Sequence, residues 1–313
     1  MAPKKISLPW FFLIILLITS SCSLFHRPNP HTISYDSFPR RIPIPELSKE
    51  QKDKFNYERE GDFVRLDKPG GESVSGYVTD NMSFLEEVMA PSLEPHMEDL
   101  SRMHPVEMMN TLLLFSHETY RTYFSTSYFS WGGDLLDLDD PQEKGPNFKK
   151  RYGFDCSGFA SMPYELAVYL DLLKAEEDSA VFSSKGFAMN AKKHGLEDKG
   201  GRGGTSNRFR VDTADMKNLG RDILTIEENT APTPEDVEKM QAGDIVLLPK
   251  GHAGIIAEIQ GQLYYLEAGG IVCPPNGGLP FEITEALTMF SQQGELVIKR
   301  SLQAYGRIAD LKE

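Results

Sequence analysis

A cysteine and a histidine in this sequence have the surroundings expected of a nucleophile and its base. Cys156 stands in the stretch RYGFDCSGFA, where the following residues predict a helix that begins at the cysteine. The unpaired N–H groups and the dipole at the start of a helix favour a thiolate, and the N–H of Cys156 can stabilise an oxyanion. The next two residues, Ser157 and Gly158, are small and leave room for a substrate. His252 opens a predicted strand and is flanked by glycines, so another side chain can approach it closely and use it as a base.

A third group should orient the imidazole, and Glu267 is the predicted one. A two-residue turn at Gln260 and Gly261 would pair Ile259 with the residue after the turn. That register places His252 and Glu267 one diagonal step apart on the same face of a hairpin, within reach of long side chains. A three-residue loop would place them on opposite faces.

The cysteine content leaves other interpretations of Cys156 open. The chain has three cysteines, Cys22, Cys156 and Cys273, far fewer than secreted disulfide scaffolds carry. A disulfide between Cys156 and Cys273 and a buried structural thiol are both alternatives to a nucleophile. A zinc site of Cys156, His252 and Cys273 is less favoured, because no two of these residues are close in sequence as in usual zinc motifs. We expect neither a metal nor another cofactor.

The elements that must position these residues come as helices first and strands afterwards. Apolar residues recur at helical spacing over residues 105–124, a turn follows at Gly132–Gly133, and a second helix starts at Cys156 and contains Pro163. Thr233 caps a short helix in TPEDVEKM. Strands are predicted in GDIVLLPK, GHAGIIAEI, QLYYLEAG and ELVIKRS, with the short breaks of an antiparallel β-meander. This order predicts an α+β fold.

The N-terminus predicts export. Residues 1–22 combine Lys4 and Lys5 with a short apolar run and small residues ahead of Cys22, the pattern of a lipoprotein signal peptide. The apolar run is too short for a confident membrane span. In this interpretation Cys22 carries lipid and begins the mature protein, and ordinary signal cleavage is the alternative.

Three segments follow the predicted signal. Residues 23–50 are proline-rich and predict an extended tether, residues 51–102 are expected to form an N-terminal extension, and residues 103–305 are expected to form the main domain.

Composition and charge narrow the possible partners. Removing the signal takes away two lysines and no acid, which changes the formal charge from −13 to −15. Nucleic-acid binding is not expected, because phosphate contacts need clustered Lys and Arg.

Four stretches taken together resemble the NlpC-type cell-wall cysteine peptidases, a papain-like family with an α+β fold. They are FSWGG, DCSGF, AGDIVLL and GHAGIIAEI, and they occur in the family's order. The resemblance covers residues 103–305. It implies hydrolysis of amide bonds in the peptide stems of peptidoglycan, often between D-glutamate and the diamino acid. It also implies Cys156 as nucleophile and His252 as general base and acid, with Glu267 where the family has a polar orienting residue.

The resemblance also implies a set of substrate contacts and a location. Asp155 and Ser157 match positions that help to recognise the free amino end of the stem, and Trp131 and Gly132 match the turn that supports the pocket. Phe129 stands where the family usually has Tyr. A lipid-anchored protein of the cell envelope is expected, facing the periplasm from the outer membrane if the cell is Gram-negative.

Other functions are compatible with the same residues. One is a catalytically silent lipoprotein that binds wall peptides or a partner through the same cleft. The complete set of Cys156, His252 and Glu267 argues against it, because a binding module does not need all three. An N-acetylmuramoyl amidase, or an acyl or peptidyl transferase, would keep the fold and change the reaction.

Overall fold

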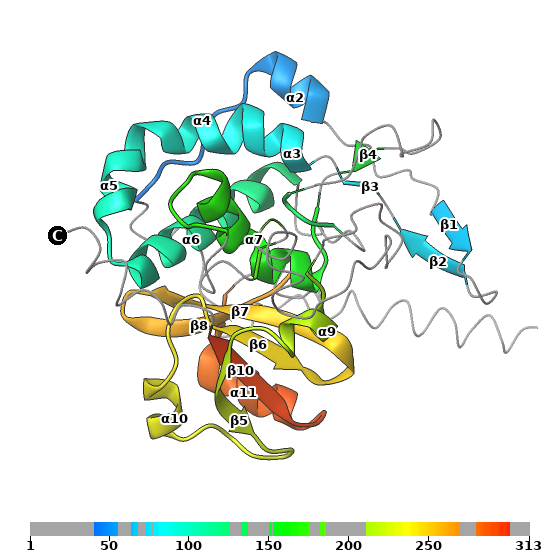
Figure 1. Cartoon of the computed structure of the whole chain (residues 1–313), viewed down its shortest axis with the longest axis vertical. Helices are drawn as coiled ribbons and strands as arrows, with labels where there is room; N and C mark the ends of the chain where they lie inside the picture. The colour runs from blue at the N-terminus through cyan, green and yellow to red at the C-terminus, as the bar shows by residue number, and fades with distance from the viewer. Residues whose placement is uncertain are drawn as a thin grey trace, which may run out of the picture.

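Helices precede a sheet in this α+β protein (Figure 1). The structure is a computed structural model, and it describes residues 41–55, 64–67, 73–76, 78–79, 81–124, 133–136, 150–151, 153–175, 182–183, 185, 211–268 and 280–300. The predicted signal peptide with Cys22 lies outside these residues. No helix in the described part of the chain has the length and apolar character needed to cross a membrane.

The helical half contains more helices than the sequence analysis predicted. The long helix predicted over residues 105–124 is present with those bounds as α6 (Pro105–Phe124), and the helix predicted to begin at Cys156 is α7 (Cys156–Tyr169). Ahead of them come α2 (Lys49–Phe55), α3 (Asn81–Phe84), a π-helical turn (Leu85–Met89), α4 (Ala90–Leu93), a 3-10 turn (Glu94–His96) and α5 (Met97–Arg102).

The N-terminal helices share one hydrophobic core with α6 and α7. Phe84, Leu93 and Leu100 are buried in the same cluster as Leu112 of α6 and Phe159 of α7. Part of the segment predicted as a tether also packs on this core, because Ile42 and Leu47 are buried in the same cluster.

Six antiparallel strands form the sheet, in the order β5-β10-β6-β7-β8-β9. The strands are β5 (Arg221–Ile226), β6 (Ile245–Leu248), β7 (His252–Ile259), β8 (Gln262–Leu266), β9 (Phe281–Glu282) and β10 (Leu296–Arg300). The predicted meander is present in β6, β7 and β8. The sequence analysis did not predict β5 or β9, nor that the last strand would lie between β5 and β6.

Short elements complete the described structure. β1 (Val64–Asp67) pairs with β2 (Ser73–Gly76), and β3 (Val78–Thr79) pairs with β4 (Lys150–Arg151). The remaining helices are α9 (Thr213–Met216), α10 (Pro234–Glu238), the 3-10 turn at Pro249–Gly251 and α11 (Ile283–Ser291). The predicted N-cap is confirmed, because the Thr233 hydroxyl accepts a hydrogen bond from the N–H of Asp236.

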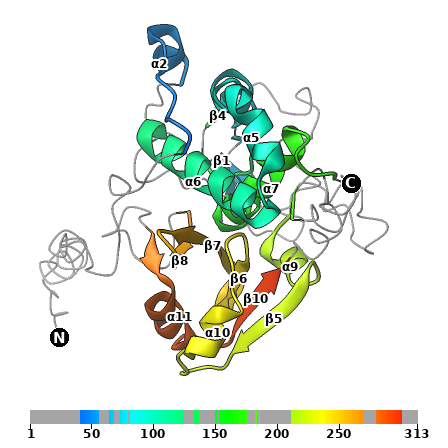
Figure 2. The same ribbon diagram turned by 90° about the vertical axis from the view of Figure 1, so that its left-hand side faces the viewer.

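The sheet is covered on both faces, which explains why its central strands read as nearly continuous apolar runs. Ile245 and Ile255 belong to the cluster shared with α6 and α7, whereas Val246 and Ile256 pack with Phe290 of α11. Figure 2 shows α6 and α7 on one side of β7 and β8, with α11 on the other. The N-terminus of α7 thereby meets the sheet where β7 begins.

Candidate active site

The start of α7 is built by its N-cap. Oδ1 of Asp155 accepts hydrogen bonds from the Gly158 N–H at 2.9 Å and from the Ser157 hydroxyl at 3.0 Å. Cys156 is the first residue of the helix and a partly exposed free thiol. Within the described residues no acceptor takes the Cys156 N–H, as expected for the first N–H of a helix. The sulfur therefore lies beside an available donor at the positive end of a helix.

His252 and Glu267 are brought together by the register of the β7–β8 hairpin. Ile259 pairs with Gln262, so the loop has the two residues predicted, and Gln260 and Gly261 take the positive φ values of 53° and 80° that such a turn needs. His252 Nε2 lies 2.6 Å from Glu267 Oε2, and both side chains are nearly buried. The predicted juxtaposition on one face of the hairpin is confirmed.

The imidazole of His252 also contacts Cys156. The two side chains interact, because Cys156 is among the groups that raise the pKa of His252, and Nε2 of the ring faces Glu267. Burial alone would lower the pKa of His252, but the hydrogen bonds to Cys156 and Glu267 and the negative charges of both raise it to about 9. The raised pKa makes the imidazole a stronger base, which keeps a proton that it has acquired at neutral pH.

Three glycines explain how the start of α7 can lie so close to the preceding loop. A Cβ on Gly158 would lie 1.9 Å from the carbonyl oxygen of Gly133, and a Cβ on Gly133 would lie 2.3 Å from the carbonyl oxygen of Gly153. The Asp155 N–H also donates to the Gly133 carbonyl at 3.3 Å. The predicted reason for Gly158, room for a substrate, is wrong, because its missing side chain makes room for the protein's own backbone.

Two buried polar side chains hold the same loop, and sequence reasoning missed both. The Asn81 amide donates to the carbonyls of Asp134 and Gly153 and accepts from the Gly153 N–H. The carboxylate of Glu165, fully buried on α7, accepts from the N–H groups of Leu135 and Leu136. Asn81 precedes the cysteine by 75 positions in the printed sequence, so no local pattern pointed to it.

A tyrosine that sequence reasoning also missed contacts the glutamate. The hydroxyl of Tyr265 donates to Glu267 Oε2 at 2.8 Å, and the ring is buried against Gly254 and Phe290. The signal that could have found it is the strand period, because residues 265 and 267 lie on the same face of a strand.

The other predicted site residues have varied placements. Asp155 and Ser157 are buried and their described contacts belong to the helix cap, so their predicted part in substrate binding stays a prediction. Phe129, Trp131 and Gly132 lie outside the described residues. The same is true of Cys22 and Cys273 and thus of the alternatives that use Cys273. Among the described residues, no group of three or more His, Cys, Asp or Glu side chains is arranged to hold a metal ion.

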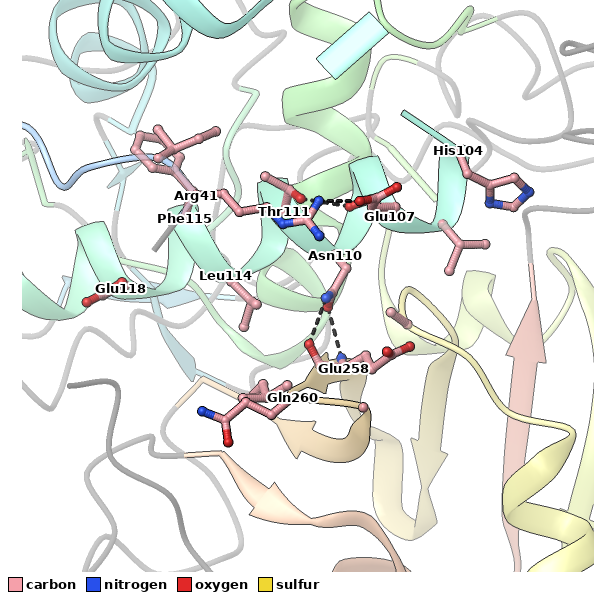
Figure 3. A pocket seen from close by; sticks show the side chains of 15 residues that line it. Arg41, His104, Glu107, Asn110, Thr111, Leu114, Phe115, Glu118, Glu258 and Gln260 are labelled. Carbon is pink, nitrogen blue, oxygen red and sulfur yellow. Dashed lines mark hydrogen bonds and ion pairs between the residues drawn. The ribbon is translucent and has the colours of Figure 1, made fainter. Parts of the chain in front are cut away.

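A pocket of about 510 Å³ lies at the far end of the hairpin from this site. Figure 3 shows Asn110 pointing from α6 toward Glu258, whose backbone N–H and carbonyl it binds at 2.9 and 2.7 Å. Arg41 forms an ion pair with Glu107 across the same pocket (Figure 3). None of its lining residues is Cys156, His252 or Glu267, so the candidate active site rests on the contacts among those three side chains.

Comparison of the chain with protein-family models, with curated proteins and with solved structures gave no match in any of the three.

Proposed function

We propose that this protein is a cysteine peptidase that cleaves amide bonds in the peptide stems of peptidoglycan. The observation that carries the proposal is the interaction of Cys156, at a helix N-terminus, with His252, whose Nε2 faces Glu267. A nucleophile, a base and an orienting carboxylate in this order are the arrangement that acyl transfer requires.

The substrate class, the papain-like NlpC-type fold and the lipid anchor at Cys22 rest on the sequence. The four motifs FSWGG, DCSGF, AGDIVLL and GHAGIIAEI resemble that peptidase family, and the N-terminal pattern resembles a lipoprotein signal. The bond between D-glutamate and the diamino acid is the proposed point of cleavage. The proposed location is the cell envelope.

Each residue has a defined part in the proposed reaction. His252 takes the thiol proton of Cys156, and the thiolate attacks the amide carbonyl carbon while the Cys156 N–H donates to the oxyanion. The imidazolium then gives its proton to the leaving nitrogen as the C–N bond breaks. A water that loses a proton to His252 attacks the thioester, and the thiolate leaves. The raised pKa of His252 suits its acid step, because the ring is protonated when the amine departs.

A digest of purified muropeptides tests the proposal. Wild-type protein should release stem fragments that mass spectrometry assigns to cleavage within the peptide, and Cys156→Ala should release none because the attacking sulfur is missing. Fragments cut between sugar and peptide would instead identify an amidase. No cleavage by wild type, or equal cleavage by the alanine variant, would refute a cysteine peptidase.

A further inference from the structure

We propose that Tyr265 is a positioning residue for the catalytic centre, because its hydroxyl fixes the carboxylate of Glu267 in the orientation that holds His252 toward Cys156. This inference rests on the proposed function for its consequence in catalysis, although the contacts that carry it are independent of the substrate.

The first observation is that two donors converge on one oxygen. Glu267 Oε2 lies 2.8 Å from the Tyr265 hydroxyl and 2.6 Å from His252 Nε2. Glu267 follows the last residue of β8, so the strand ladder does not hold its backbone directly. A carboxylate on a side chain with several rotatable bonds can turn away from an imidazole unless a second contact restrains it. The tyrosine supplies that contact.

The second observation is that the tyrosine ring is itself fixed from two sides. It is only 1% exposed and meets the ring of Phe290 on α11 edge-on, with ring centroids 4.9 Å apart. On its other side it lies over Gly254, where a Cβ would be 2.3 Å from two ring carbons and 2.4 Å from the hydroxyl oxygen. The glycine two residues after His252 is therefore the space that the ring occupies.

The third observation concerns the chemistry of the phenol. Burial, followed by the charge of Glu267 and the hydrogen bond to it, raises the pKa of Tyr265 well above its ordinary value. The hydroxyl consequently remains a neutral donor over the pH range in which a cysteine–histidine pair works. Within the described residues, the ionisable groups that act on His252 are Cys156 on α7 and Glu267 after β8, and Tyr265 touches the second of these.

Tyr265→Phe in the full chain tests the proposal, since it removes one hydroxyl and keeps the ring. The pKa of His252, followed by NMR of its ring, should move down toward the ordinary value as Glu267 loses its fixed position. On cleavable muropeptides kcat should fall on the order of tenfold, the effect of losing a hydrogen bond to a charged group, with little change in KM.

Tyr164→Phe is the matched control, because the Tyr164 hydroxyl also makes a buried 2.8 Å hydrogen bond, to the Gly243 carbonyl, without touching Glu267. It should leave the pKa of His252 unchanged. Gly254→Ala tests the ring position, which Tyr265→Phe leaves unchanged. The added Cβ should displace the Tyr265 ring and so lower the pKa of His252.

The outcomes separate this inference from the proposed function. An unchanged or higher His252 pKa in Tyr265→Phe overturns the positioning role, even if wild type cleaves muropeptides. A lowered pKa, together with a wild-type protein that cleaves no muropeptide, supports the positioning role and refutes the proposed substrate instead.

Discussion

At the scale of single residues, the site depends on which charges surround His252. Burial opposes its protonation, whereas Cys156 and Glu267 favour it, and the balance places its pKa at about 9. In the proposed mechanism the histidine must be protonated when the amine leaves. The alkaline side of the pH–rate profile should therefore report the loss of this proton from the coupled cysteine–histidine pair.

Glu267→Gln should shift that alkaline limb to lower pH. The change removes a negative charge that raises the pKa of His252 and leaves a neutral amide oxygen as the acceptor of the Nε2 hydrogen bond, so the ring loses its proton earlier as pH rises. We also expect kcat/KM to fall on the order of tenfold, because a charged hydrogen bond of about 1.5–3 kcal/mol is replaced by a neutral one of about 0.5–1.5 kcal/mol. The measurement is kcat/KM on a muropeptide from pH 5 to pH 10.

Glu258→Gln provides the control for this prediction. Glu258 is an exposed glutamate on the same strand as His252, and its substitution changes the net charge equally. Its profile should follow wild type. If Glu267→Gln kept the wild-type limb, Glu267 would not be the group that raises the histidine pKa.

At the scale of elements, the sulfur is placed by close contact between α7 and the loop before it. Gly158 lies in the first turn of a helix, where alanine normally stabilises by about 0.5–1 kcal/mol relative to glycine. Here the added carbon would lie 1.9 Å from a backbone oxygen that cannot rotate away. The steric conflict should outweigh the helix propensity.

Gly158→Ala should therefore destabilise the protein by about 2 kcal/mol, in the range measured for overpacked cores, and reduce Cys156 reactivity by moving the helix start. Urea unfolding and the rate of thiol alkylation measure the two effects. At Gly261, a Cβ would meet no atom within 4 Å, so Gly261→Ala should cost only the strain of its positive φ, about 1 kcal/mol. If Gly158→Ala had the same urea midpoint of unfolding as wild type, the close contact between Gly158 and the Gly133 carbonyl would be contradicted.

At the scale of the whole molecule, hydrogen bonds of two adjacent residues, Gly243 and Asp244, connect the helical layer with β10 just before β6 begins. Asp244, which is fully buried, accepts hydrogen bonds from Arg300 on β10 at 2.8 and 2.7 Å. The neighbouring Gly243 carbonyl accepts from Tyr164 of α7. Burial raises the pKa of Asp244, and Arg300 counteracts this shift. Removing Arg300 would leave a buried carboxylate without its cation.

Arg300→Met should lower the free energy of unfolding by about 3 kcal/mol at pH 7. The pKa of Asp244 is above its unfolded value in the folded protein, and losing Arg300 raises it further. As pH rises through the folded-state pKa of Asp244, ionisation of this buried carboxyl destabilises the folded protein. The loss of unfolding free energy in Arg300→Met should therefore be smaller at pH 4 than at pH 7. Urea unfolding at the two pH values checks the sign.

Adding Asp244→Asn to Arg300→Met should recover part of the loss at pH 7, because a neutral amide is less costly to bury than a carboxylate. A deficit that is the same at both pH values and does not respond to the second substitution would mean that lost packing of the arginine stem accounts for the effect.

Local patterns in the sequence determined the features that depend on neighbouring residues. The helix over residues 105–124, the start of α7 at Cys156 and the Thr233 cap follow from periodicity and capping chemistry. The two-residue turn at Gln260–Gly261 determined the register that pairs His252 with Glu267, because strand period and loop length together decide which side chains share a face.

Only the tertiary structure decided the features that join distant segments. Local patterns did not predict that β10 lies between β5 and β6, or that Asn81 holds the loop at Gly153. Nor did they predict that the Tyr265 ring packs over Gly254, because a glycine in a strand does not indicate which side chain fills the space beside it. Periodicity and capping are properties of a few adjacent residues, whereas these contacts form only when the two layers pack together.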